Sequence, residues 1–414
     1  MSGSLQRARG NRVIGPIERD VRLVLAAQAV RAFGYGFGSV LLASTLAERG
    51  LTAIDVGVVL GSLVAGTVVA QLAVARWADG WGRRRSYLTL YVLLGLAGLV
   101  FASTAPLWVL MAVALTGALS AEVIESGPFT SLELSMLSGR IDPDALATGF
   151  GWYNAVAAAA GALGALSAGL PQLSRTLWAA PPDRVWFLLL VPIAAGGAII
   201  ARSLSPSVEL TGERREAAPL GPSRPTVIRL AGLFGLDSFA GSFVVQSFIA
   251  FWLIDRLGAT TAAVGSLFAA VGVIQTLSFL VAPMIARRWG LLNTMVFTHL
   301  PSNVLLAAVA LAPNLAVAAG LLLARAALSQ MDVPTRQAYV MILVEPQERT
   351  AASAYTNTAR YLARPLGPLL AGAITVVTAG APFLIAGFLK SVYDLTLWSW
   401  FRAIPLPDTK EHIP

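Results

Sequence analysis

The chain has 414 residues, of which 56% are hydrophobic and only 13% are charged. Because an ordinary water-soluble domain carries about 25% charged residues, this composition excludes that class and indicates a polytopic protein of the lipid bilayer. The 30 Lys and Arg outnumber the 22 Asp and Glu, which points to a biased distribution of charge between the two sides of a membrane.

Apolar runs of about 20 residues recur along the whole chain, and that length crosses roughly 30 Å of hydrocarbon as an α-helix. Twelve such runs lie at residues 22–46, 55–75, 87–105, 107–132, 145–171, 185–203, 228–254, 260–283, 291–312, 314–341, 351–378 and 381–402. We therefore predict an all-α membrane protein with twelve transmembrane helices.

Polar segments divide these runs into two sets of six. We expect a basic N-terminal tail at 1–21, a six-helix bundle at 22–203, a linker at 204–227, a second bundle at 228–402 and a tail at 403–414. Few basic residues fall in the loops opposite the tails: Arg49, Arg175, Arg184 and Arg256. Since cytoplasmic loops carry the excess of Lys and Arg, we expect both termini in the cytoplasm and a multi-pass protein of the inner (cytoplasmic) membrane.

The two halves also resemble each other in sequence. At one constant offset, Asn154 matches Asn357 and Gly164 matches Gly367. Repeated matches of this kind indicate an internal duplication. We therefore expect two pseudo-symmetric six-helix bundles.

Residues 75–85 join the second and third runs and read ARWADGWGRRR. This segment resembles the signature G-x-L-A-D-R-x-G-R-R of the major facilitator superfamily, although an alanine replaces the first glycine. The resemblance implies a twelve-helix transporter in which Asp79 latches one conformation against the N-terminal end of the eleventh helix. The residues that carry this expected latch are Asp79, Gly82, Arg83 and Arg84. The alternative is a basic turn that only sets topology.

Residues 365–372 resemble the Gly-Pro motif that exporters of this superfamily carry in the fifth helix. Together these features resemble bacterial efflux-type members of the superfamily. The resemblance implies a secondary active transporter that works by alternating access, and proton-coupled export is the first expectation. One alternative is an importer or exchanger of an anionic metabolite, such as a carboxylate or phosphate. Another is a membrane protein that handles lipids or senses a signal without transporting a solute. The expected partners are a small-molecule substrate, protons and the lipid bilayer, for a monomer that binds no nucleic acid.

Carboxylates within the predicted spans are candidates for proton coupling. A charge in hydrocarbon costs roughly 2.5 to 3.5 kcal/mol on insertion scales, so it needs a partner or a water-filled cavity. Glu122 and Glu125 lie three residues apart in the fourth span, on one face of a helix at mid-depth. Two carboxylates so placed do not ionise together easily, so one of them tends to hold a proton. Proton coupling requires a carboxylate of this kind. Asp237 of the seventh span is the third candidate.

Charged residues of several spans are expected to line a substrate cavity: Arg31, Arg325, Asp332, Arg360 and Arg364. Arg31 and Asp237 occupy matching places in the two halves and are expected to face each other across this cavity. Alternatively, Arg31 pairs with an acid of the fourth span. The arginines of the second half suit an anion, which they bind through bidentate hydrogen bonds, unless neighbouring acids neutralise them.

Two further expectations concern the peripheral helices of the second half. Lys390 and Asp394 are four residues apart and are expected to form an ion pair within one helix. His299 is expected to be a structural histidine with satisfied hydrogen bonds.

The sequence lacks motifs of several enzyme classes. The only lysines are Lys390 and Lys410, and neither follows a glycine, which excludes a phosphate-binding G-x-x-x-x-G-K-[ST] loop. The chain also lacks a Cys/His metal cluster and a serine-nucleophile elbow. We expect no enzymatic activity, no metal and no cofactor.

Overall fold

The computed structural model describes residues 16–120, 122–123, 127–138, 146–177, 181–209, 220–345 and 348–404. For residues 16–18, 79, 138, 146–151 and 350 only the backbone is described. Within these ranges the protein is helical and no strand occurs. Nine of the described helical segments are long and apolar enough to cross a membrane. The tail boundaries stay predictions, because residues 1–15 and 405–414 lie outside the described ranges.

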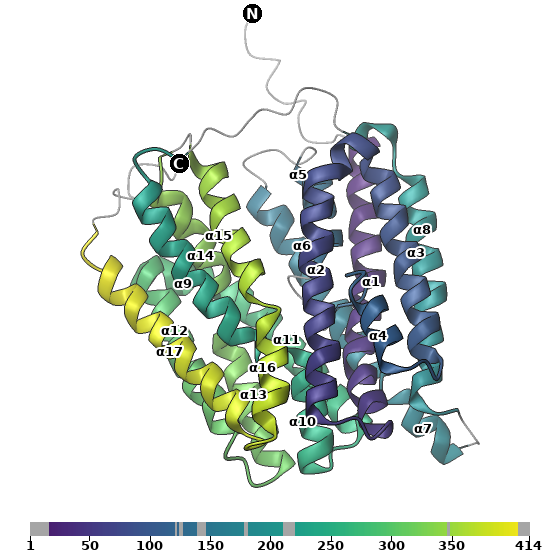
Figure 1. The fold of residues 1–414 in the computed structure, drawn as a ribbon. Coiled ribbons are helices and arrows are strands. Elements are labelled where there is room, and N and C mark those ends of the chain that lie inside the picture. Colours follow the sequence, from purple (N-terminus) through teal and green to yellow (C-terminus); the bar gives the residue numbers. More distant parts are fainter. Residues whose placement is uncertain are drawn as a thin grey trace, which may run out of the picture.

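The helices of the first half form one bundle, drawn in purple through blue to teal in Figure 1. They are α1 (Pro16–Glu48), α2 (Ala53–Trp81), α3 (Arg83–Ala102), α4 (Leu107–Ala114), α5 (Gly127–Ser138), α6 (Leu146–Ser167), α7 (Leu170–Leu177), η2 (Asp183–Leu189) and α8 (Leu190–Ser203). A short turn, η3 (Pro206–Val208), follows in the linker.

The helices of the second half form the other bundle, drawn in green to yellow. They are α9 (Arg224–Ser242), α10 (Gln246–Leu257), α11 (Thr261–Trp289), α12 (Leu291–Val309), α13 (Leu315–Ser329), α14 (Asp332–Leu343), α15 (Arg349–Ala363), α16 (Leu366–Thr375) and α17 (Ala381–Phe401). Together the two bundles form the predicted fold, an all-α membrane protein with two pseudo-symmetric halves.

Several predicted spans are interrupted, which the sequence patterns did not predict. The fourth is split into α4 and α5, the tenth into α13 and α14, and the eleventh into α15 and α16. Proline explains the break after Arg364, because Pro365 lacks the N–H that would continue the helical hydrogen bonds. The breaks place polar residues of these spans on backbone that is not part of a regular helix.

The halves pack closely at the end of the molecule where α2 begins, and their ribbons diverge toward the other end (Figure 1). Glycine makes this approach possible. A Cβ atom on Gly57 of α2 would lie 2.8 Å from the Cα of Gly372 in α16, and one on Gly265 of α11 would lie 2.3 Å from the carbonyl oxygen of Ala165 in α6. Gln246 adds a polar contact, since its Nε2 donates to Ser39 Oγ at 2.9 Å.

Candidate functional site

A cavity of about 230 Å³ lies between the two bundles. The first half contributes Glu122 and a wall of small residues from α6, which includes Ala158, Gly161 and Ala162. The second half contributes most of the polar lining: Asp237, Ser238, Gln246, Gln275, His299, Arg325, Ser329, Gln330, Asp332, Arg336, Arg360, Arg364 and Lys390. The cavity is therefore chemically asymmetric, with its charge concentrated in the second half.

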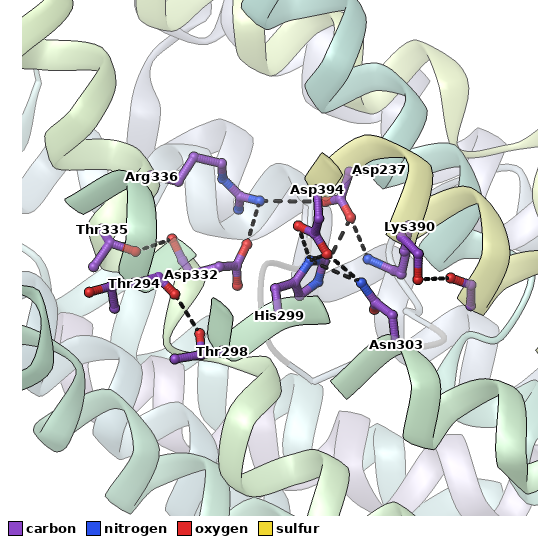
Figure 2. A network of polar contacts seen from close by, with 12 residues as sticks. Asp237, Thr294, Thr298, His299, Asn303, Asp332, Thr335, Arg336, Lys390 and Asp394 are labelled. Carbon is purple, nitrogen blue, oxygen red and sulfur yellow. Dashed lines mark hydrogen bonds and ion pairs between the residues drawn. The ribbon is translucent and has the colours of Figure 1, made fainter. Parts of the chain in front are cut away.

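A network of ion pairs occupies the wall formed by the second half, as Figure 2 shows. The Nζ of Lys390 in α17 donates to Oδ1 of Asp237 in α9. Nη1 of Arg336 in α14 lies 3.0 Å from Oδ2 of Asp332 and 3.5 Å from Oδ2 of Asp237. Because opposite charges pair here, these four residues are neutral as a group.

The expected ion pair between Lys390 and Asp394 within α17 is wrong. Lys390 pairs with Asp237 of the facing helix, while Nδ1 of His299 lies 2.9 Å from Oδ1 of Asp394. Asn303 Nδ2 also donates to Asp394 Oδ2 at 2.8 Å, so Asp394 has its partners in α12 (Figure 2). His299 is buried and hydrogen-bonded, as a structural histidine should be, although it also borders the cavity.

Arg325 of α13 differs from these residues. It lines the cavity, and its Nε atom is buried and has no hydrogen-bond partner in the described part of the chain. Asp237, Glu122 and Asp332 lie near enough to interact electrostatically with it. None of the ion pairs among the described residues includes Arg325. Its charge is thus available to a ligand in the cavity.

Glu122 and Arg364 form an ion pair that joins the two halves across the cavity. Their side chains are 27% and 15% exposed. Arg360 lines the same cavity, as expected for an arginine one helical turn before Arg364. The predicted helix face shared by Glu122 and Glu125 is wrong for Glu122, which lies between α4 and α5 and is not helical. Glu125 lies outside the described residues.

The segment that holds Glu122 leaves the helix because of two local features. Gly117 has a φ of 69° and packs against Gly66 of α2, a conformation and an approach that a side chain would prevent. The carbonyl of Ala118, which no helical turn satisfies, accepts a hydrogen bond of 2.6 Å from the hydroxyl of Tyr35. The chain can therefore project Glu122 toward the second half without leaving this buried carbonyl unpaired.

Arg31 does not line the cavity, contrary to expectation. Its side chain is fully buried, and its Nη2 lies 2.5 Å from Oε2 of Glu133 in α5. Glu133 also accepts hydrogen bonds from the hydroxyls of Tyr87 and Tyr153. Arg31 and Asp237 therefore do not face each other, and the alternative is confirmed, a pair with an acid of the fourth span. Burial explains the choice, because a charge inside a bundle needs a partner within that bundle.

The glycine turn between α2 and α3 contacts the linker. Gly82 has a φ of 105°, which a residue with a side chain rarely adopts. The backbone N–H groups of Arg83 and Arg84 donate to the carboxylate of Glu209 at 2.6 Å and 3.2 Å. The side chain of Asp79 lies outside the described part, so its contact with the eleventh helix stays a prediction. Sequence reasoning missed Glu209, because no motif marks a single acid in a polar linker.

Comparisons with known proteins agree with this architecture. The sequence model of the Major Facilitator Superfamily matches residues 24–368. The chain is 25% identical over 424 residues to the uncharacterized membrane protein YJR124C of Saccharomyces cerevisiae, an alignment that covers 93% of this chain and 95% of the yeast protein.

Solved structures of transporters have the same fold. The xylose transporter XylE from E. coli, in an inward open conformation, has a TM-score of 0.70 at 14% identity, covering 94% of this chain and 97% of XylE. The nucleoside transporter NupG has a TM-score of 0.68 at 14% identity, covering 92% of this chain and 99% of NupG. The human organic anion transporter MFSD10 has a TM-score of 0.60 at 17% identity, covering 93% of this chain and 100% of MFSD10. This chain belongs to the major facilitator superfamily and is a multi-pass membrane transporter, not an enzyme.

Proposed function

We propose that the chain is a secondary active transporter that carries a small anion across the cytoplasmic membrane. The observation that carries this proposal is Arg325, which borders the cavity and forms no ion pair with the described residues. The Nε atom of this guanidinium is buried without a hydrogen-bond partner among the described residues, which is costly, and the planar donors of arginine match a carboxylate or phosphate. An anionic solute supplies the direct partner.

The charge of the cavity wall supports the same conclusion. Among the described lining residues, five are basic: Arg325, Arg336, Arg360, Arg364 and Lys390. Three are acidic: Glu122, Asp237 and Asp332. The described part of the wall therefore carries a net positive charge with His299 neutral, which favours anions over cations.

The sequence left two kinds of transporter open, a proton-coupled exporter and an importer or exchanger of an anionic metabolite. This proposal favours the second. Export rested on the Gly-Pro motif at residues 365–372 and on Arg325 in the tenth span, which the anion proposal explains differently. The glycines of that motif have a packing role, since a Cβ atom on Gly372 would lie 2.8 Å from the Cα of Gly57, and one on Gly367 would overlap Ser242. Packing accounts for the motif without reference to the direction of transport.

The way the halves meet supports transport by alternating access. They are in close contact where α2 begins, at Gly57 and Gly372, and their ribbons diverge toward the end of the molecule where α2 ends. With the termini in the cytoplasm, as the positive-inside rule predicts, this conformation faces inward. Transport requires a second state in which the Gly57 contact opens and the Gly82 end closes.

The experiment is solute flux into proteoliposomes with an imposed proton gradient. Four solutes are compared: a dicarboxylate, inorganic phosphate, a neutral sugar and an organic cation, with empty liposomes as the control. We expect the dicarboxylate or the phosphate to enter and the sugar and the cation to stay out. Flux of the cation or the sugar alone, or of none of the four, would contradict an anion transporter.

A further inference from the structure

We propose that the carboxylate of Glu122 takes the place of the substrate at Arg364 in the empty transporter. A proton and a small organic acid then bind together, the proton to Glu122 and the acid to Arg364. This inference rests on the proposed anion transport and gives it a substrate class, a carboxylate, and a coupling mode, symport with a proton.

The Glu122–Arg364 pair differs in position from the other ion pairs of the cavity wall. The side chains of Asp237 and Asp332 are each 6% exposed and pair with basic residues of their own half. Glu122 is 27% exposed, and its partner belongs to the opposite half. Among the described residues, it forms the ion pair that joins the two bundles. The Glu122–Arg364 pair is therefore more accessible to a solute in the cavity than the pairs of Asp237 and Asp332.

The backbone on both sides of this pair favours exchange of partners. Glu122 lies in the break between α4 and α5, where its own N–H is bonded to the hydroxyl of Ser120 at 3.2 Å. Arg364 lies in the break between α15 and α16, directly before Pro365. Neither residue is inside a regular helix, so the backbone that carries either side chain can shift with the loss of fewer helical hydrogen bonds.

The chemistry of the exchange is a competition for one guanidinium. Arginine binds a carboxylate through two parallel N–H···O bonds, and a bound glutamate blocks the same donors for a substrate. When a proton adds to a carboxyl oxygen of Glu122, the side chain becomes neutral and releases Arg364 to the substrate carboxylate. The bound proton and the bound anion cancel in charge, so a monocarboxylate and its proton move without net charge.

Charged groups of both signs share the cavity with Glu122. Arg325, Arg360 and Arg364 are the basic groups that suit a carboxylate ligand, and Asp237 and Asp332 are the acidic ones. Because the basic groups belong to the second half, separation of the halves weakens their effect on Glu122. The pairing of Glu122 with Arg364 therefore differs between the two states of the transport cycle.

Binding to purified protein tests this inference. Acetate, succinate and citrate, each with its amide as a neutral control, are titrated calorimetrically at about pH 7.5 and pH 5.5 into wild type, Glu122→Gln, Arg364→Gln and Glu48→Gln. Glu48 is the matched control, an acid that is 40% exposed and pairs with Arg175 away from the cavity.

We expect Glu122→Gln to bind at least one acid more tightly than wild type at pH 7.5, by at least about fivefold, the lower end of typical coupling between sites. Its affinity should no longer rise at pH 5.5, while wild type and Glu48→Gln tighten at the lower pH. Arg364→Gln should lose the binding at both pH values. Glu122→Gln should fold, because the amide has the size of the carboxylate and the site is open to the cavity.

The outcomes separate this inference from the proposed function. No acid binding to Glu122→Gln, or equal affinity of that variant and wild type at pH 7.5, overturns the role of Glu122. If anions are transported but Glu122→Gln has the affinity of wild type, the proposed function stands and the role of Glu122 does not. If phosphate binds and no carboxylate binds, the proposed function also stands, but the carboxylate class is overturned. Transport restricted to neutral or cationic solutes overturns both.

Discussion

Replacement of Glu133 by glutamine should strongly destabilise the first bundle. Arg31 and Glu133 are both fully buried, and the carboxylate also accepts hydrogen bonds from Tyr87 and Tyr153. The amide keeps the shape of the site but leaves the Arg31 guanidinium without a counterion. Loss of one partner of a buried pair costs about 3–5 kcal/mol, because the remaining charge stays desolvated. For a bundle of this size the loss lowers the melting temperature by on the order of 10 °C.

The assay is thermal unfolding in detergent, followed by tryptophan fluorescence. Glu48→Gln serves as the control, since it removes an exposed acid and should change the melting temperature by little. A double variant, Arg31→Met with Glu133→Leu, should be less destabilised than Glu133→Gln, because it leaves no buried charge unpaired. A melting temperature of Glu133→Gln equal to that of wild type would refute this reasoning.

Three further variants test other parts of the structure. Gly57→Ala should slow transport and shift the protein away from the observed state, because its Cβ would lie 2.6 Å from the carbonyl oxygen of Pro368. Distances between spin labels on the two halves measure this shift, and unchanged distances would refute it. Asp394→Asn should lower the melting temperature, since it breaks the contact with His299 between α12 and α17, and a wild-type melting curve would count against this role. Hydrogen bonds from Ser223 and from the Gly221 N–H lower the pKa of Glu348 below its ordinary value of 4.5. Its stabilising contribution is therefore present above about pH 4.5 and lost as the pH falls through the lowered pKa. Glu348→Gln should unfold more easily than wild type at neutral pH and equally at very low pH, and parallel melting curves at every pH would contradict this.

The architecture was predictable from the sequence because it depends on properties that are local along the chain. Runs of about 20 apolar residues mark membrane spans wherever they occur. The turn around Gly82 is marked by its glycine and arginines. Both signals are independent of which helix lies beside which, so the two bundles followed without knowledge of their packing.

The partners of the buried charges were not predictable in the same way. Lys390 lies one helical turn from Asp394, yet it pairs with Asp237 of a facing helix. Arg31 matches Asp237 in the internal repeat, yet it pairs with Glu133. The partner of each buried charge depends on which helices lie side by side. The spacing of residues along one helix carries no information about that packing.

The break in the fourth span has a signal in the sequence. Gly117, Ser120 and Pro128 occur within one predicted span, and each residue type weakens a helix. Their combination favours an interrupted span, which takes Glu122 off the helix face that it was expected to share. The linker contact of Glu209 carried no such signal.

Uptake of an anion by variants of Arg325 tests the central claim most directly. The measurement is the initial rate of dicarboxylate or phosphate uptake into proteoliposomes for wild type, Arg325→Gln and Arg325→Lys. Arg256→Gln is the control, an exposed arginine at the end of α10 and outside the cavity lining. We expect Arg325→Gln to lose uptake, Arg325→Lys to retain part of it, and Arg256→Gln to match wild type, with all four proteins folded. Wild-type uptake by folded Arg325→Gln would contradict an anion site at Arg325.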